Sequence, residues 1–594
     1  MKIKHLFGLA VIAAMTASCS SNEDLGTAGP GTGTNEAGVG YVAFNINLPT
    51  QSGSSSRAGS ENDQFDAGTP NEYDVKDATL LIFEGADEAN AQFKGAYTLN
   101  TAPWKDNGQT DNITTTSATI VKQIDTPASS DHCYALVVLN KNDVFTVDEA
   151  AKTITLKGAP ATFSGKYKVF AESLSDEDLT KKGFYMANAP LASVAGGTTE
   201  PTGAKITTLV SLKGKIMETE SEAKGAPAQI YVERGVAKVT MQNTSTPATV
   251  DGSTKFGGTS SVDFKITSWV LDNTNKKTYL VRSTDGFGDW TSLASNSTTL
   301  DPANKYRFIG SSAVATGLYR TYFAKDANYT ATENENAITA KDLVTSATPS
   351  FESTFGNDNP QYCFENTFDA TCQNDHYTTR VLIKAKLNSG ETFYVFNGDQ
   401  NTIYPIDNVK NEIKKYYLIE NEAWIKANVT PATGKSEVDG DDLDVEISDA
   451  AGKVSITSIT FKSGVTVSSS ATVPTNYDEV LKRIGSIDEY KNGESYYFVR
   501  IKHFGDDMTP WNKDETTKPS TSSIYPTDNQ AGNYLGRYGV LRNNWYDISV
   551  TGVKGLGSAV VPKVTPNTDD ELKSYIAVKI NVLSWAKRSQ SVVL

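Results

Sequence analysis

The chain has 594 residues, of which 21% are charged, with a formal net charge of −15 and a pI of about 5.0. This length allows about two to four domains of ordinary size. The acidic balance argues against nucleic acid as a partner, because phosphate binding requires clustered Lys and Arg. The sequence has 27 Tyr and only 6 Met, and it is rich in Thr, Val, Ser and Gly, which favours strands and turns over helices.

The sequence begins with a short leader. Two lysines precede an apolar run over residues 6–15, and small residues lead from it to Cys19. This pattern is typical of a secretory signal, and the run is too short to span a bilayer, which needs about 20 residues. Because a cysteine stands at the cut, the segment looks like a bacterial lipobox and predicts a signal peptide over 1–18 with lipidation of Cys19. The alternative is an ordinary signal peptide with an incidental cysteine.

A tether and then a strand follow. Residues 26–40 are rich in Gly, Thr and Pro and indicate a flexible tether. Residues 41–48 alternate with period two, which predicts a strand with one face toward a core. The apolar side chains of that face are Val42, Phe44, Ile46 and Leu48.

Arg57 is the only Lys or Arg between Lys4 and Lys76, and it lies in a Ser-rich loop after this strand. Exposed loops of small residues are where proteases cut. A trypsin-like enzyme would therefore find one site here, between Arg57 and Ala58. The alternative is a surface arginine in a disordered loop.

Further strands are expected at 78–83, 134–139 and 153–157. A break in composition at 224–227 predicts a domain boundary near residue 228. The N-terminal domain would then cover residues 58–228, and the C-terminal domain residues 229–594.

Several local patterns mark the second region. Turn-like sequences at 273–275 and 388–390 predict two hairpins. The alternation over 454–461 slips by one residue at Thr457-Ser458, which predicts a β-bulge.

Helical signals are few. Residues 476–484 have acidic residues early, basic residues late and Gly485 after them, which predicts a helix. A weaker pattern favours another helix over 409–419. The expected fold class is therefore mostly β, with short helices on the outside.

A second well-patterned strand is expected near the C-terminal end of the sequence. Residues 576–584 alternate with period two, and only ten residues follow them. The apolar positions of this strand are Ile576, Val578, Ile580 and Val582.

Three cysteines remain when Cys19 is assigned to lipid. Cys133 adjoins a strand-like segment and is interpreted as a small buried hydrophobic residue. Cys363 and Cys372 are near enough in sequence to close a small loop, and export permits a disulfide between them. Two buried thiols are the alternative.

No catalytic or metal-binding motif stands out. The four histidines form neither HExxH nor Cys/His pairs with zinc spacing, and there is no Gly-x-Ser-x-Gly elbow. The acidic run over 439–446 has oxygen ligands suited to Ca²⁺ but lacks EF-hand spacing, so a solvated loop is the better interpretation. We therefore expect no enzyme activity, catalytic residue, metal or cofactor.

Several segments resemble the type V pilus fimbrillins of Bacteroidales, in particular the major subunits of short-type fimbriae. The strongest is 536–548, which is similar to the C-terminal fimbrillin signature and carries Arg542-Asn543-Asn544-Trp545. Structural roles are expected for these residues, since aromatics bury large areas and Asn and Arg satisfy loop backbone. Further resemblance lies, in order, at 233–239, 268–277, 320–326, 363–368 and 578–585.

The resemblance implies two tandem β-sandwich domains of transthyretin-like, Greek-key type. It also implies a route of export as an outer-membrane lipoprotein, cleavage by an arginine-specific protease, and loss of the first strand. The C-terminal strand of another subunit then fills the emptied groove. Arg57 stands at the position of the family's cleavage site, so residues 19–57 would be a propeptide.

The preferred interpretation is the major stalk subunit of an adhesive fimbria on the cell surface. Its partners would be other copies of itself and accessory, tip and anchor fimbrillins. An accessory or tip subunit needs no donor strand, and an anchor subunit keeps its lipid and escapes cutting. A surface glycan-binding lipoprotein, with Trp104, Trp290 and Trp511 as candidate platform residues, and an extracellular glycosidase are the other classes considered.

Overall fold

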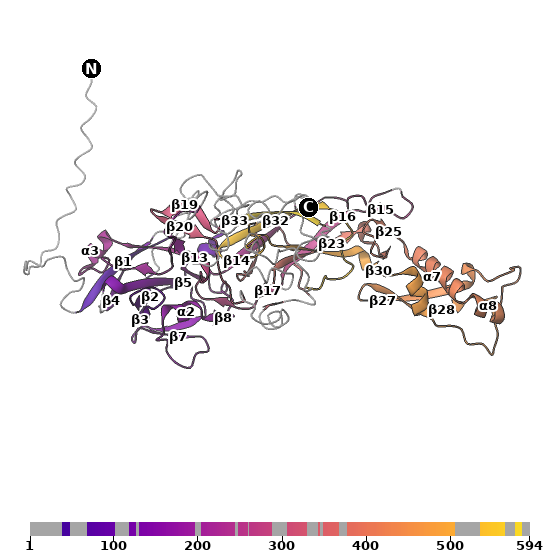
Figure 1. Ribbon diagram of the computed structural model, residues 1–594, viewed down its shortest axis with the longest axis horizontal. Coiled ribbons are helices and arrows are strands. Elements are labelled where there is room, and N and C mark those ends of the chain that lie inside the picture. Colours follow the sequence, from indigo (N-terminus) through magenta and orange to yellow (C-terminus); the bar gives the residue numbers. More distant parts are fainter. Residues whose placement is uncertain are drawn as a thin grey trace, which may run out of the picture.

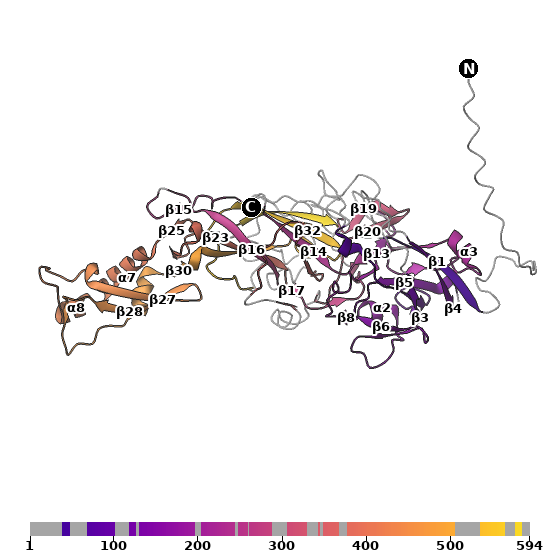
Figure 2. The ribbon, with the colours of Figure 1, turned by 180° about the vertical axis from the view of Figure 1, so that it is seen from behind.

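The structure is a computed structural model. It describes residues 38–47, 68–100, 118–125, 127, 130–196, 203–243, 247–258, 260–287, 306–328, 343–344, 349–367, 377–504, 535–564 and 576–584. The molecule is elongated, with β1 (Val39–Asn47) and α3 (Glu220–Gly225) at one end and α8 (Glu422–Asn428) at the other (Figure 1). The reverse view shows the same order of parts along the long axis (Figure 2).

The N-terminal part is built on an eight-stranded sheet in the order β3-β2-β5-β9-β13-β1-β4, with β12 also paired to β5. Its central strands are continuous apolar runs, as in Ala135–Leu139, because both of their faces are covered. The sheet curls until β3 and β4 come into contact. The bounds are β2 (Ala78–Glu84), β3 (Gln92–Leu99), β4 (Ala118–Asp125), β5 (Cys133–Leu139), β9 (Met186–Asn188), β12 (Val210–Ser211) and β13 (Ala228–Arg234).

Short elements surround this sheet. They are α1 (Pro70–Tyr73), η2 (Ser130–His132), the β6 (Phe145–Asp148) and β7 (Thr153–Leu156) hairpin, α2 (Tyr167–Ala171), and β8 (Leu174–Ser175) paired with β18 (Thr278–Tyr279). A four-stranded sheet contains β11 (Ile206–Thr207), β10 (Leu191–Ala192), β20 (Leu318–Thr321) and β19 (Ile309–Ala315), in that order.

Two sheets sandwich the core of the C-terminal part. One has the order β22 (Gln361–Cys363), β14 (Ala237–Gln242), β32 (Asn544–Val553) and β33 (Ile576–Ser584), and the other β16 (Phe264–Asp272), β23 (Arg380–Leu387) and β31 (Glu494–Arg500). Val239, Ile548, Trp269 and Ile383 come from both sheets and meet in one core. Smaller elements are β15 (Thr254–Lys255) with β25 (Thr402–Ile403), β17 (Thr274–Asn275) with β21 (Leu343–Val344), η3 (Asn388–Gly390) and η5 (Lys491–Gly493).

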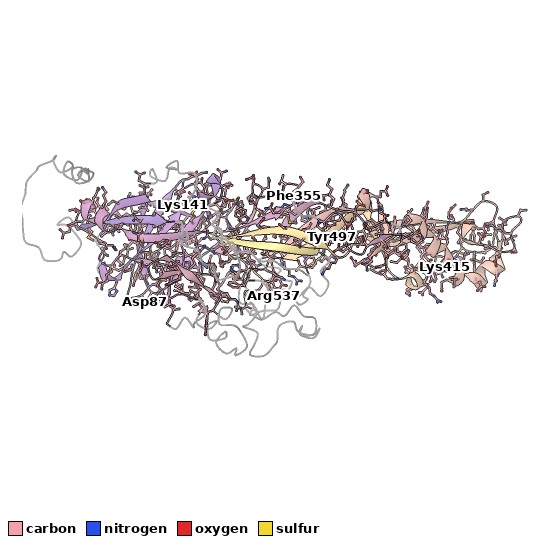
Figure 3. All side chains as sticks on the ribbon, turned by 90° about the horizontal axis from the view of Figure 1, so that it is seen from above. Asp87, Lys141, Phe355, Lys415, Tyr497 and Arg537 are labelled. Carbon is pink, nitrogen blue, oxygen red and sulfur yellow. The ribbon has the colours of Figure 1, made fainter. Side chains whose placement is uncertain are left out.

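A third unit at the far end has its own apolar core, which the sequence did not lead us to expect. Its sheet, β24-β30-β28-β27, is covered by α7, whose Val409, Ile413 and Tyr417 recur every four residues and are all buried. Figure 3 shows Lys415 of α7 at this end and Lys141 in the N-terminal part. The bounds are β24 (Phe393–Phe396), α7 (Ile406–Glu420), β26 (Val429–Thr430), η4 (Gly440–Asp442), β27 (Leu443–Ala450), β28 (Lys453–Phe461), β29 (Thr466–Val467), α9 (Tyr477–Ile484) and β30 (Ile487–Tyr490).

The predicted mostly β fold is confirmed, and so are both predicted helices, as α7 and α9. The bulge is also confirmed, because the β27–β28 register skips Thr457. The two predicted hairpins are wrong. Asn273 and Asn388 do adopt the left-handed backbone of turns. In the first case β16 pairs with β23 and β18 with β8, and in the second β23 is paired on both edges by β16 and β31 while β24 pairs with β30.

Val236 belongs to the first core and Ala237 to the second, but Leu280 and Val281 belong to the first core again, so the domain boundary near residue 228 stays a prediction. β13 starts at Ala228 and belongs to the N-terminal sheet, so the strand after the predicted boundary packs with the residues before it. Among the described residues, no helix has the length and apolarity needed to cross a membrane.

Candidate functional site: the slot of the first strand

β1 lies inside the N-terminal sheet rather than at its edge. It pairs parallel with β13, from Phe44↔Ala228 to Asn47↔Tyr231, and antiparallel with β4 along the full length of β4. We call the space that β1 fills between β13 and β4 the first-strand slot. A chain that left this slot would expose one edge of each neighbouring strand.

The core-facing side chains of β1 are deeply buried in this slot. Val42, Phe44 and Ile46 have no exposed surface, as the alternation of the sequence predicts, and Ala43 on the other face is also fully buried. Leu48, the fourth predicted member, lies outside the described residues. Both faces of the strand are therefore covered, and burial of a side chain of this size contributes about 1.5–3 kcal/mol.

The start of β1 is tied down by the segment before α3. The backbone N–H of Tyr41 donates to the carbonyl of Met217 at 2.8 Å, and the Met217 N–H returns the bond at 2.9 Å. α3 then begins with a capping box in which the hydroxyl of Thr219 accepts from the N–H of Glu222 and the Glu222 carboxylate accepts from that of Thr219. This helix contacts β1 and β4, so it closes one end of the slot.

The predicted processing sites fall outside the described residues. Cys19, Arg57 and Ala58 are all in this group, so lipidation and cleavage remain predictions. The described chain resumes at residue 68 and enters α1, where Glu72 is fully buried.

β33, the candidate donor strand, is an edge strand of its own subunit. It pairs antiparallel with β32 from Val553↔Ile576 to Asn544↔Ser584, with a bulge between Val550 and Gly552. The apolar positions of β33 stand opposite buried residues of β32. The pairs are Ile576 with Val553, Val578 with Val550, Ile580 with Ile548 and Val582 with Tyr546, and the β32 member of each pair is buried. In Figure 3 the two yellow strands, β32 and β33, lie along the middle of the molecule.

The segments that resemble fimbrillins meet at the junction of the two cores. Arg542 Nη2 lies 3.2 Å from Glu365 Oε1 and donates to Thr278 Oγ1 at 2.9 Å. Arg282 makes a forked pair with Glu233 at 2.9 and 2.8 Å. All four charged side chains are almost fully buried, and burial raises the pKa of Glu233 while the Arg282 guanidinium opposes that rise.

A second buried group connects α1 to this junction. Glu72 Oε1 pairs with Lys238 Nζ at 2.8 Å and accepts from the Tyr362 hydroxyl at 2.5 Å, and the Glu72 carbonyl accepts from Arg234 Nε at 2.8 Å. The Lys238 ammonium also lies 4.0 Å from the centre of the Trp545 ring. We call Glu72, Arg234, Lys238 and Tyr362 the α1 cluster.

The motif residues therefore have structural roles. Asn543 takes the left-handed conformation and its side chain accepts from the Arg234 N–H, Asn544 donates to the carbonyls of Leu541 and Arg542, and Trp545 donates to Thr240. Sequence reasoning missed Glu72 and Lys238 as a pair. The signal available was a lysine inside the apolar run Val236-Ala237-Lys238-Val239, since charged groups are rarely buried unless paired.

The described residues contain no group of three or more His, Cys, Asp or Glu arranged to hold a metal ion. Asp439 and Asp442 of the acidic run pair with Lys435 and form a capping box around η4.

Cys133 and Cys363 are buried, and burial raises the pKa of each thiol to about 12. Cys372 lies outside the described residues, so a Cys363–Cys372 disulfide stays a prediction.

Comparison with known families supports the resemblance. Residues 488–591 match the family model described as "Major fimbrial subunit protein type IV, Fimbrillin, C-terminal". This range contains β31, β32 and β33, and hence the Arg542–Trp545 motif and the candidate donor strand. The C-terminal part of the chain is thus similar to the C-terminal region of fimbrillins, the family that the sequence resembles.

Two solved structures align with most of the chain at low identity. A candidate cell adhesion protein from Parabacteroides distasonis is 11% identical with a TM-score of 0.33, over 93% of this chain and 98% of that one. The tip fimbrial protein Mfa3 from Porphyromonas gingivalis, with a C-terminal truncation, is 10% identical with a TM-score of 0.27, over 92% of this chain and 100% of that one. No curated protein matches the chain.

Proposed function

We propose that this chain is the polymerising stalk subunit of a surface fimbria that supports adhesion. It is exported as an outer-membrane lipoprotein through Cys19 and cut after Arg57 by an arginine-specific protease. The first strand then leaves, and a C-terminal segment of another copy takes its place. The fimbrillin match over residues 488–591 supports the class of protein, and the first-strand slot supports the mechanism.

The observation that carries the proposal is the position of β1 between two strands. Its removal uncovers apolar side chains from the N-terminal core together with the backbone edges of β13 and β4. An incoming strand restores both ladders by strand addition. To do so it must run in the direction of β1, parallel to β13 and antiparallel to β4.

A head-to-tail exchange of this kind does not close on itself, so it builds a filament. The donor is either β33 after it detaches from β32, or residues 585–594 while β33 stays in place. Detachment of β33 would break a nine-residue ladder. This cost favours a donor that includes residues beyond Ser584.

An accessory or tip subunit is the near alternative, because it would share the slot and differ only in lacking a donated strand. An anchor subunit would keep β1 and its lipid. The glycan-binding reading rests on Trp104, Trp290 and Trp511, which all lie outside the described residues. The continuous strand pattern up to Ser584 favours the stalk role over these.

Two substitutions at the cleavage site test the mechanism. Arg57→Lys keeps a trypsin site but removes the arginine that an arginine-specific enzyme requires, and Arg57→Ala removes both. After limited trypsin treatment, the wild-type chain and Arg57→Lys should polymerise, while Arg57→Ala should stay monomeric. In cells, only the wild-type chain should form fimbriae. Polymerisation of Arg57→Ala at the wild-type rate would refute the cleavage step.

A further inference from the structure

β4 depends on β1 for its place in the sheet. Every residue of β4 is paired with β1, from Val39↔Asp125 to Ile46↔Ala118, and among the described strands β1 is the only ladder partner of β4. When β1 leaves the first-strand slot, β4 therefore loses all of these ladder bonds at once. Its inner edge then faces the unpaired edge of β13.

The directions of the strands permit these two edges to join. β1 is parallel to β13 and antiparallel to β4, so β4 is antiparallel to β13. Neighbouring strands lie about 4.8 Å apart, so β13 and β4 are about 10 Å apart while β1 is between them. A movement of β4 by one strand width would bring them into an ordinary antiparallel pair.

The register also fits. Ile120, Phe44 and Ala228 form one row across the three strands, and Ala118, Ile46 and Ile230 form another. Without β1, Ile120 would stand opposite Ala228, and Ala118 opposite Ile230. Each row then pairs a large residue with a small one, and directly opposite residues keep the same face of the sheet.

The far end of β4 is held in place by other contacts. The backbone N–H of Asp125 donates to the Tyr97 hydroxyl at 3.1 Å, and the Asp125 carboxylate pairs with Lys152. β13 faces only the other end of β4, where residues 228–230 stand across β1 from residues 120–118. The half of β4 that includes Ile120 can therefore approach β13 while Asp125 stays near β3.

We propose that β4 pivots about its Asp125 end when β1 leaves, pairs with β13, and closes the first-strand slot until a donated strand displaces it. This inference rests on the proposed function only in taking β1 as the strand that departs. In the closed form the backbone edges of β4 and β13 pair with each other, so the cleaved subunit no longer presents them to other chains. A donated strand must compete with β4, which slows the start of a filament and discourages pairing with wrong partners.

A cysteine pair distinguishes the two positions of β4. Ile120→Cys and Ala228→Cys place thiols on strands that β1 separates, which is too far for a disulfide, since bonded cysteines have Cα atoms about 4.4–6.8 Å apart. In the closed form the two residues are directly opposite. The native Cys133 and Cys363 are buried, and each single-cysteine variant controls for pairing with native thiols.

The slot is emptied in two independent ways. One is cleavage at Arg57, and the other is Phe44→Asp with Ile46→Asp, which places two carboxylates in the apolar core without any cut. Hydrogen exchange over residues 39–47 reports whether β1 has left. Disulfide formation is followed by mass under mild oxidation, with and without an excess of a synthetic peptide of residues 38–49.

We expect the disulfide to form at least ten times faster once β1 has lost protection, and the peptide to slow it again by a similar factor. The inference would be overturned if β1 loses its protection from hydrogen exchange and the disulfide forms no faster. It would also be overturned if the disulfide forms just as fast while β1 is still protected in the slot. The aspartate variants need no cleavage. If the cysteine variant forms the disulfide once β1 has left, but the wild-type chain without the added cysteines never polymerises after cleavage, the proposed function is contradicted and the pivot of β4 remains supported.

Discussion

Glu72 Oε1 lies 2.8 Å from Lys238 Nζ, with both side chains only 1% exposed, and this pair joins the chain just after the predicted cleavage loop to the central strand β14. Tyr362 and Arg234 add hydrogen bonds to the same glutamate. The α1 cluster thus holds the segment that would become the N-terminal end of the cleaved subunit. Departure of β1 need not disturb it.

Breaking this pair should be costly, because it leaves a buried charge without compensation. We expect Glu72→Gln to lower the free energy of unfolding by about 3–5 kcal/mol. Glu72→Gln combined with Lys238→Met removes both charges and should recover much of that loss. Glu220→Gln, which breaks an exposed pair with Lys224, is the matched control and should change stability by less than about 0.5 kcal/mol. Denaturant unfolding gives the comparison, and equal effects of Glu72→Gln and Glu220→Gln would contradict this account.

Phe44→Ala should matter only while β1 is in the slot. In the uncut chain it removes a fully buried ring and should cost about 3–5 kcal/mol. After cleavage at Arg57 and removal of β1, the wild-type and variant chains are identical and should melt at the same temperature. The measurement is thermal unfolding of both proteins before and after trypsin. Equal melting temperatures of the two uncut proteins would contradict the burial of Phe44 in the slot, and a difference after trypsin would show that β1 had stayed bound.

Stability should depend on pH through Glu88. Burial raises its pKa to about 7 from an ordinary value of 4.5, although the N–H groups of Thr208 and Leu209 bond to the carboxylate. Because the folded state binds this proton more tightly, the contribution is complete below pH 4.5 and is lost as the pH rises through 7. It should amount to no more than about 3–4 kcal/mol.

Glu88→Gln tests this pH dependence. The variant should unfold with a smaller change in midpoint between pH 5 and 8 than the wild-type chain. Asp326, whose pKa burial also raises to about 7, contributes equally to both proteins, so some slope remains. An unchanged slope in Glu88→Gln would contradict the assignment to Glu88.

Deletion of residues 585–594 tests whether these residues are donated to another subunit or belong to the core of their own subunit. If these residues are donated to another subunit, the truncated monomer should unfold at the wild-type midpoint and fail to polymerise after trypsin treatment. Addition of a β1 peptide to the cleaved, truncated chain should restore its stability but not its polymerisation. A truncated monomer that is unfolded would instead place this tail in the core of its own subunit.

The sequence predicted the elements whose signals are local. The alternation at Val42, Phe44 and Ile46 identified β1, and the slip at Thr457 identified a bulge. Which strands pair with each other could not be predicted from the sequence. The turn at Asn388 is real, but the strands around it enter different sheets, because pairing depends on which edges meet in space. A turn sequence does not report this.

The ion pairs at the junction of the two cores could not be predicted from local patterns, because their members are far apart in the sequence. Glu72 and Lys238 are 166 residues apart in sequence, and Arg542 and Glu365 are 177 apart. The motif around Arg542 was identified by resemblance and its structural role was expected. The separate core around Val409 and Ile413 was not foreseen, since an amphipathic helix shows which face is buried but not against which sheet.

The central claim is that the assembled protein has lost its first strand. The most direct measurement is N-terminal sequencing of the protein sheared from cells. The account predicts a chain that begins Ala58-Gly59-Ser60, with no peptide from residues 39–47 recovered by mass spectrometry. A filament protein that still carries residues 39–47, or a lipid on Cys19, would contradict it.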